Sequence, residues 1–318
     1  MKRFIQRKEK NNKLKAVVFA YSNMGIVGLE ALARHGYDII AVFTHEDDAQ
    51  EKCWFDSVKQ WASLRNIPVS TENGGNSLHG IEKIRKFKPD IIFSFYYRKM
   101  IAGEILAIPS YGAYNLHGSL LPKYRGRCPV NWVIINGEKV TGVTLHRMID
   151  KPDAGDIVGQ KETAIDFQDT AKTLNEKLCR TAALLLDELL PGMLTGPIPS
   201  CKQNLQAGSY FGGRKPEDGR IEWNKPSIAI YNLIRAVTDP YPGAFAFLAN
   251  QEKIIIWWAQ PVEAFNKCIP GTVIIEREVL VQTGNGAIKL LHIEAAGKHL
   301  TGYDIVNYFR EGKVDRLI

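Results

Sequence analysis

The sequence predicts a mixed α/β protein, in which a domain with a mostly parallel sheet is followed by a small antiparallel β domain. Through the first two-thirds of the chain, apolar runs typical of buried strands alternate with helix-like segments. Residues 195–220 are rich in glycine, proline and polar residues, which favours a domain boundary there. Beyond them come short β-rich runs separated by turn residues.

The first domain begins with a strand over residues 14–21 (LKAVVFAY), a near-continuous apolar run expected of a strand buried on both faces. A turn over residues 22–25 leads into a helix over 26–35, which ends at Gly36. The same alternation predicts further elements. The strands lie at 37–44, 67–70, 90–97, 112–117 and 143–148, and the helices at 55–66, 81–88 and 101–107.

A long helix is predicted over residues 170–194, because apolar residues recur along one face at helical spacing. The stripe consists of Leu174, Leu178, Ala182, Leu185 and Leu189. The glycines and prolines between Pro191 and Pro199 are expected to end this helix.

The second domain is predicted to be a small antiparallel barrel or sandwich. Its strands lie at 244–249, 253–259, 271–275, 279–283 and 287–293, and Gly284-Asn285-Gly286 indicates a hairpin turn. The chain therefore divides into a basic tail (1–13), an α/β domain (14–200), a linker (201–214) and a β domain (215–318).

The net charge of +7 over 318 residues is concentrated in the tail. Residues 1–15 carry seven basic side chains and one acid, whereas residues 16–318 carry 34 basic and 33 acidic ones. A nearly neutral body argues against a nucleic-acid partner. The chain has neither an apolar stretch long enough to insert into a membrane nor a signal-peptide pattern. Five scattered cysteines without a CxxC pair favour a reducing cytoplasm over a disulfide framework.

The strongest chemical signal is the run from Asn115 to Arg127 (NLHGSLLPKYRGR). Asn115 and His117 are two residues apart on a predicted strand, so they share one face. Polar side chains on a central strand must be satisfied or functional, and open α/β sheets bind ligands at the carboxyl ends of strands. Lys123, Arg125 and Arg127 in the loop that follows suit an anionic substrate. The alternative is a structural His–Asn pair beside a solvated loop.

The second candidate is Asp153, in the loop after the strand at 143–148. A carboxylate there can approach His117, favour the protonated imidazole and fix its tautomer. The alternative is an ordinary turn aspartate.

Other patterns are weaker. Residues 25–28 (GIVG) supply half of a dinucleotide fingerprint, and the histidines lack metal-binding spacing, so no metal is expected. Cys128 is interpreted as a small buried thiol rather than a nucleophile. The aromatic residues Phe93, Phe95, Tyr96 and Tyr97 fit either core packing or a pocket for a flat ligand.

The motifs together resemble the folate-dependent formyltransferases. The resemblance rests on Asn115-Leu116-His117 with Ser119-Leu120-Leu121-Pro122, and on Asp153 farther along. It covers about residues 14–295, and additional runs look like the formyltransferase domain of the bifunctional polymyxin-resistance enzymes. These runs are 93–98 (FSFYYR), 123–127 (KYRGR), 143–148 (VTLHRM) and 239–245 (DPYPGAF).

The resemblance implies a Rossmann-like catalytic domain, an OB-like second domain, and 10-formyltetrahydrofolate as co-substrate without a metal. By the same match His117 is the catalytic histidine, Asn115 the transition-state stabiliser and Asp153 the acid that tunes the histidine. Charge suggests that Tyr124, Arg125 and Arg214 contact the substrate. The family's folate contacts fall on Lys99, Met100, Ile101, Arg127, Ile149, Asp150, Lys151, Pro152 and Asp153.

The acceptor implied by the resemblance is a nucleotide-linked amino sugar, UDP-4-amino-4-deoxy-L-arabinose, used in lipid A modification. The alternatives are a dTDP-4-amino sugar and methionyl-tRNA. The tRNA enzymes carry a basic loop after the second strand, where this chain has the acidic residues 44–52 (THEDDAQEK), which would repel phosphodiesters.

Two further expectations concern the ends of the enzyme. The polymyxin-resistance enzymes continue into a decarboxylating dehydrogenase domain, whereas this sequence ends at Ile318, so only the transfer step is expected. An OB-type nucleic-acid-binding protein is the non-enzyme alternative, and it needs interleaved basic and aromatic residues. The run 254–258 (IIIWW) has only Lys253 beside it. The oligomeric state is left open.

Overall fold

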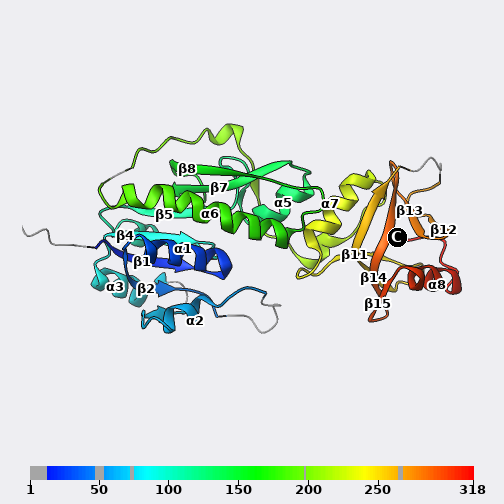
Figure 1. The fold of residues 1–318 in the computed structure, drawn as a ribbon, viewed down its shortest axis with the longest axis horizontal. Coiled ribbons are helices and arrows are strands. Elements are labelled where there is room, and N and C mark those ends of the chain that lie inside the picture. The colour runs from blue at the N-terminus through cyan, green and yellow to red at the C-terminus, as the bar shows by residue number, and fades with distance from the viewer. Residues whose placement is uncertain (1–12, 47–53, 72–74, 197, 264–267) are drawn as a thin grey trace, which may run out of the picture.

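The structure is a computed structural model that describes residues 13–46, 54–71, 75–196, 198–263 and 268–318. The predicted basic tail lies outside these residues except for Lys13, as does the acidic loop from Asp47 onward. Figure 1 shows an elongated molecule, with the large sheet at one end and a smaller antiparallel sheet at the other.

The large sheet has seven strands in the order β3-β2-β1-β4-β5-β7-β8. β1 to β5 run parallel, and β7 and β8 are antiparallel additions at one edge. The predicted mostly parallel sheet is thus confirmed. The strands are β1 (Lys15–Ala20), β2 (Asp38–Phe43), β3 (Val69–Ser70), β4 (Ile91–Phe95), β5 (Ala113–His117), β7 (Val140–Arg147) and β8 (Ile157–Ala164).

Helices cover both faces of this sheet because alternate residues of its strands are apolar on each side. In β1, Ala16 and Val18 pack into the core that contains α1 (Ser22–Arg34) and α6 (Ala171–Met193), which lie side by side in Figure 1. Phe19 packs on the opposite face with α3 (Leu78–Phe87) and α4 (Gly103–Leu106). The remaining helices of this domain are α2 (Val58–Ser63) and α5 (Pro129–Ile135).

Two helix boundaries differ from the sequence expectations. The turn predicted over residues 22–25 is absent, since α1 begins at Ser22, whose φ of 58° makes the change of direction in one residue. The second helix, α6, continues through Pro191 and Gly192 instead of ending there. Leu190 and Met193 are buried on this last turn, so packing compensates for the unfavourable residues.

Several elements were not predicted from the sequence. They are α5, β8, the helices of the second domain and β15. Along β8 the residues alternate between half-buried and exposed, as on an edge strand, and its polar residues Gln160, Lys161 and Glu162 hide the β signal.

The second domain is a six-stranded antiparallel sheet in the order β10-β11-β14-β13-β12, with β15 paired to β14. This arrangement is consistent with the expected small barrel-like domain. Its strands are β10 (Ala244–Phe247), β11 (Lys253–Val262), β12 (Val273–Ile275), β13 (Val279–Gln282), β14 (Ala287–Ala295) and β15 (Lys298–Thr301), and its helices are α7 (Ser227–Val237) and α8 (Tyr303–Glu311).

The two domains meet where α5 packs against α7. The Asn131 side chain of α5 donates a hydrogen bond to the carbonyl oxygen of Ala236 at 2.7 Å. Arg235, which is fully buried on α7, donates to the carbonyl oxygens of Asp166 and Asp169 ahead of α6. These bonds fix the second domain beside the carboxyl ends of the parallel strands. In the described part of the chain, no helix has the length and apolar character needed to cross a membrane.

Candidate active site

A cavity of about 1040 Å³ opens where the carboxyl ends of β1, β4 and β5 meet. The strand order of the sheet reverses beside β1, and open α/β sheets bind ligands at such a point. Ser22 follows β1, Tyr97 follows β4, and Gly118 follows β5 on the cavity wall, and Tyr241 comes from the segment ahead of β10. Both domains therefore form the site.

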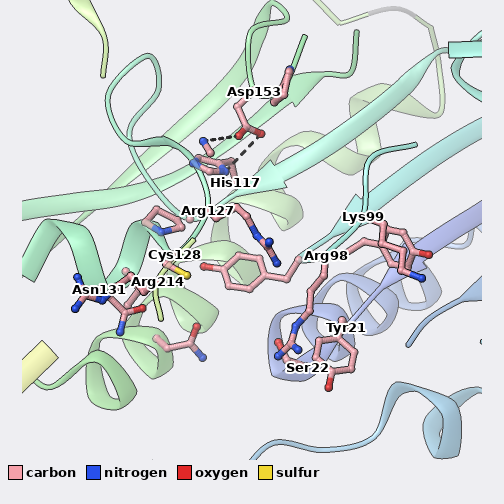
Figure 2. A pocket seen from close by; sticks show the side chains of 18 of the residues that line it. Tyr21, Ser22, Arg98, Lys99, His117, Arg127, Cys128, Asn131, Asp153 and Arg214 are labelled. Atoms are coloured by element: carbon pink, nitrogen blue, oxygen red, sulfur yellow. Dashed lines mark hydrogen bonds and ion pairs between the residues drawn. The ribbon is translucent and has the colours of Figure 1, made fainter. Parts of the chain in front are cut away.

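Three side chains identified from the sequence meet in this cavity. β5 holds Asn115 and His117 on one face, as the spacing predicted, and Asp153 lies in the connection from β7 to β8. Oδ1 of Asp153 is 3.4 Å from Nδ2 of Asn115 and 3.6 Å from Nδ1 of His117. Figure 2 shows Asp153 and His117 pointing toward each other.

The imidazole of His117 is held by a backbone carbonyl group. Its Nε2 lies 2.8 Å from the carbonyl oxygen of Tyr124, and a carbonyl oxygen can only accept, so Nε2 carries a hydrogen. Nδ1, which faces Asp153, is therefore the ring atom that can gain or lose a proton. The Ser119 hydroxyl closes the same loop by donating to the carbonyl oxygen of Lys123 at 2.7 Å.

Asp153 is a charged carboxylate in a constrained loop. Its backbone has a φ of 49°, and its Oδ2 accepts the amide hydrogen of Gly126 at 2.8 Å. Burial raises the pKa of the carboxyl group, but the charge of His117, the contacts with His146 and the Gly126 bond outweigh this effect, so the pKa of Asp153 lies well below its ordinary value. The group is thus ionised at neutral pH.

A second histidine, His146, belongs to the same cluster. It lies directly opposite Asn115 in the antiparallel pair of β5 and β7. Its Nε2 is 3.1 Å from Nδ2 of Asn115 and 3.5 Å from Oδ1 of Asp153, and the residue is 2% exposed. Sequence reasoning missed this role. The strand at 143–148 was recognised, but its pairing partner and register were not readable from the sequence.

Most residues proposed to contact the folate line the cavity. The members of that set on its wall are Lys99, Met100, Ile101, Arg127, Ile149, Pro152 and Asp153, while Asp150 and Lys151 are exposed and not among the lining residues. Arg214, proposed as a substrate contact, also lines the cavity and lies over the ring of Trp132 at 4.9 Å. Arg127 extends into the cavity beside Cys128 in Figure 2.

The structure does not bring the side chains of Tyr124 and Arg125 to the cavity. Tyr124 is buried, stacks on Phe211 and donates its hydroxyl hydrogen to Glu138 at 2.7 Å. Arg125 is 8% exposed and belongs to the short strand β6 (Arg125–Gly126). The charge pattern of the loop had suggested both as substrate contacts, but the backbone of this loop turns these side chains into the protein.

The segment after α6 folds back over the site. This return segment, residues 198–214, contains the short helix η2 (Leu205–Ala207) and β9 (Tyr210–Phe211), and β9 pairs with β6. Nε2 of Gln203 donates to the carbonyl oxygens of Asp153 and Gly155 at 3.0 and 2.6 Å. Oγ of Ser209 accepts the amide hydrogen of Tyr124 at 2.8 Å. The segment that the sequence predicts as a linker therefore also holds both loops of the site.

The aromatic run after β4 divides between core and cavity. Phe93 and Phe95 are fully buried in the sheet core, whereas Tyr96 and Tyr97 line the cavity. Tyr97 stacks on His45 with ring centres 4.3 Å apart, and Tyr21 meets the same imidazole edge-on. The tyrosines thus supply the flat wall that the sequence left as one of two interpretations.

Within the described ranges, no cluster of three or more histidine, cysteine, aspartate or glutamate side chains is arranged to hold a metal ion.

The fold and the site define a two-domain α/β enzyme class with an Asn–His–Asp cluster at the switch point of the sheet. Two family models match the sequence: that of formyl transferases over residues 14–189, and that of the formyl transferase C-terminal domain over residues 214–310. The chain therefore belongs to the formyl transferase family.

Solved structures share this fold. An N-formyltransferase from Helicobacter canadensis, in complex with folinic acid and dTDP-3-aminofucose, matches with a TM-score of 0.67 and 23% identity over 87% of this chain and 98% of its own. WlaRD, a sugar 3N-formyl transferase studied with dTDP and 5-N-formyl-THF, matches with a TM-score of 0.65 and 22% identity over 90% and 98%.

A third match, to a HypX variant from Aquifex aeolicus, has a TM-score of 0.62 and 19% identity over 96% of this chain. It covers 49% of that protein, so the present chain spans about half the length of HypX. At these identities the likeness concerns the fold.

Proposed function

We propose that this protein transfers a formyl group from 10-formyltetrahydrofolate to the primary amine of a nucleotide-linked amino sugar. The observation that carries the proposal is the convergence of Asn115, His117 and Asp153 on one cavity in a formyl transferase fold. Their arrangement supplies a charged acid, an imidazole with one exchangeable proton and an amide within hydrogen-bonding reach of each other.

The proposed reaction is an acyl transfer without a covalent enzyme intermediate. The acceptor amine forms a bond to the formyl carbon, and the bond from that carbon to the folate nitrogen breaks. His117 takes the proton that the amine loses and passes it to the leaving nitrogen. Asp153 holds the imidazolium between these two steps, and Asn115 lies beside the reacting centre, where it stabilises the developing charge.

The cavity lining supports an anionic acceptor with a flat base. Lys99, Arg127 and Arg214 reach its wall and suit the phosphates of a nucleotide diphosphate. Tyr21 and Tyr97 offer ring faces for stacking. The folate donor is assigned to the portion lined by Met100, Ile101, Ile149 and Pro152, in keeping with the family's folate contacts.

Among amino sugars, UDP-4-amino-4-deoxy-L-arabinose is the preferred acceptor, because residues 93–98, 123–127 and 143–148 resemble the polymyxin-resistance enzymes. This choice implies a cytoplasmic enzyme of lipid A modification. The dTDP-linked amino sugars rank second, supported by the dTDP-3-aminofucose that the Helicobacter canadensis structure contains.

An acceptor panel tests the proposal. The protein is incubated with 10-formyltetrahydrofolate and, separately, UDP-4-amino-4-deoxy-L-arabinose, a dTDP-4-amino sugar, dTDP-3-aminofucose and methionyl-tRNA, and products are identified by mass spectrometry. We expect formylation of the UDP sugar at a higher kcat/KM than any other acceptor. Preference for a dTDP sugar would correct the nucleotide, and preference for the tRNA would contradict the acceptor class.

A further inference from the structure

The amide of Asn115 uses both of its hydrogens on protein acceptors. Nδ2 lies 3.1 Å from Nε2 of His146 and 3.4 Å from Oδ1 of Asp153. Its Oδ1 accepts no hydrogen bond from any residue that the structure describes, and Asn115 lines the cavity. The amide therefore turns its nitrogen to the protein and leaves its oxygen for a ligand.

The tautomer of His146 explains this orientation. Nδ1 of His146 lies 2.8 Å from the carbonyl oxygen of Arg147, and a carbonyl oxygen only accepts, so Nδ1 carries a hydrogen. A neutral ring with its hydrogen on Nδ1 has a lone pair on Nε2. That lone pair accepts one amide hydrogen of Asn115, and the Asp153 carboxylate accepts the other.

The opposite state of His146 would reverse the amide. A hydrogen on Nε2 would set two donors against each other at 3.1 Å, and turning the amide would relieve the conflict by presenting Oδ1 of Asn115 to His146. The nitrogen would then face the cavity. Because His146 is 2% exposed, water cannot readily substitute for either partner, and the state of this ring decides which end of Asn115 a substrate meets.

We propose that His146 is a positioning residue for the formyl transfer inferred above: in its neutral form, with the hydrogen on Nδ1, it fixes the Asn115 amide so that the oxygen faces the substrate cavity. The oxygen then accepts an N–H of the acceptor amine and aims the nitrogen lone pair at the formyl carbon. This inference rests on the proposed function for its kinetic consequence, but not for the tautomer itself.

The tautomer is measured directly by nitrogen-15 NMR of the full-length, substrate-free protein labelled in histidine, at pH 7.5. The His146 signals are identified by their loss in His146→Gln. We expect a protonated Nδ1 and an unprotonated Nε2. A proton on Nε2, whether in the other tautomer or in the imidazolium form, would overturn the proposal.

Kinetics test the consequence with three variants. His146→Leu removes the acceptor for Asn115 and is expected to lower kcat about 10- to 100-fold, with the KM of both substrates within about twofold of wild type. His146→Gln places an amide oxygen near the position of Nε2 and is expected to restore kcat to within about fivefold of wild type. The matched control, His299→Gln, changes an exposed histidine on β15 and should leave kcat unchanged.

The outcomes separate the two proposals. Wild-type kcat in His146→Leu, or a folded His146→Gln as slow as the leucine variant, would overturn the positioning role. If the wild type formylates no acceptor in the panel, the proposed function fails, and the NMR spectrum still decides the tautomer. If His146→Leu does not fold, the glutamine variant and the spectrum carry the test.

Discussion

Oδ2 of Asp153 accepts the backbone amide hydrogen of Gly126 at 2.8 Å. This bond ties the loop between β7 and β8 to the loop that follows β5, which are remote in sequence. It leaves Oδ1 as the atom shared by Asn115, His117 and His146. The geometry of the whole cluster thus depends on one carboxylate whose two oxygens have different tasks.

Replacing that carboxylate by an amide separates its charge from its shape. Asp153→Asn keeps the side-chain size and tolerates the φ of 49°. Without the negative charge, the protonated His117 loses its partner, and we expect kcat to fall about 100-fold or more, since general acid–base catalysis of this kind contributes roughly that much. Steady-state kinetics with unchanged circular dichroism checks this. A variant with near-wild-type kcat would contradict the role of Asp153.

The pKa of Asp153 predicts how stability depends on pH. The folded-state pKa lies below the unfolded value of about 3.9, so the stabilisation is complete above that value and is lost as the pH falls through the folded pKa. The difference in unfolding free energy between wild type and Asp153→Asn should be full at pH 5 and should narrow progressively below about pH 4. Urea titrations at each pH measure it. A difference that grows toward low pH would contradict the direction of the shift.

Gly118 leaves room for a buried tyrosine. A methyl group at this position would overlap the hydroxyl oxygen of Tyr96, and that residue has a φ of 56° and is fixed beside the cavity. We expect Gly118→Ala to destabilise the protein by about 1–3 kcal/mol and to lower activity, because it also displaces the backbone next to His117.

Gly212→Ala is the matched control for that substitution, since a methyl group there meets no atom within 4 Å. Its free energy of unfolding should stay within about 0.5 kcal/mol of wild type in denaturant titrations. Equal stability of the two variants would show that the contact between Gly118 and Tyr96 does not limit the site.

The return segment positions the catalytic loop through Gln203. Its side-chain nitrogen bridges the carbonyl oxygens of Asp153 and Gly155, so Gln203→Ala frees the loop that carries the acid. We expect kcat to fall about tenfold, because small misplacements of catalytic groups are costly. Gln206→Ala, an exposed neighbour on η2, is the control and should retain wild-type kcat. Equal kcat values for the two variants would argue against this positioning effect.

The sequence predicted the parts of the site that depend on local spacing. Asn115 and His117 share a face because they are two residues apart on a strand, and that relation survives any choice of strand order. Asp153 could be placed near His117 only through the family resemblance. Its contact with Gly126 and its left-handed backbone depend on how two distant loops meet.

Residues that depend on pairing between distant strands were beyond the sequence. His146 faces Asn115 because β7 runs antiparallel to β5 in one register, and a shift by one residue would turn it to the other face. Likewise, Tyr124 and Arg125 carry the chemistry expected of substrate contacts, but pairing with β9 in the return segment buries their loop. Neither pairing has a local sequence signal.

The central claim, that His117 transfers the proton in formyl transfer, is tested most directly by comparing wild type with His117→Ala. The measured quantity is the rate of formylated product formed from 10-formyltetrahydrofolate and the best acceptor of the panel, at saturating concentrations of both. The account predicts a folded variant whose kcat is about 100-fold or more below that of wild type, with similar KM values. Equal turnover by the two proteins would contradict it.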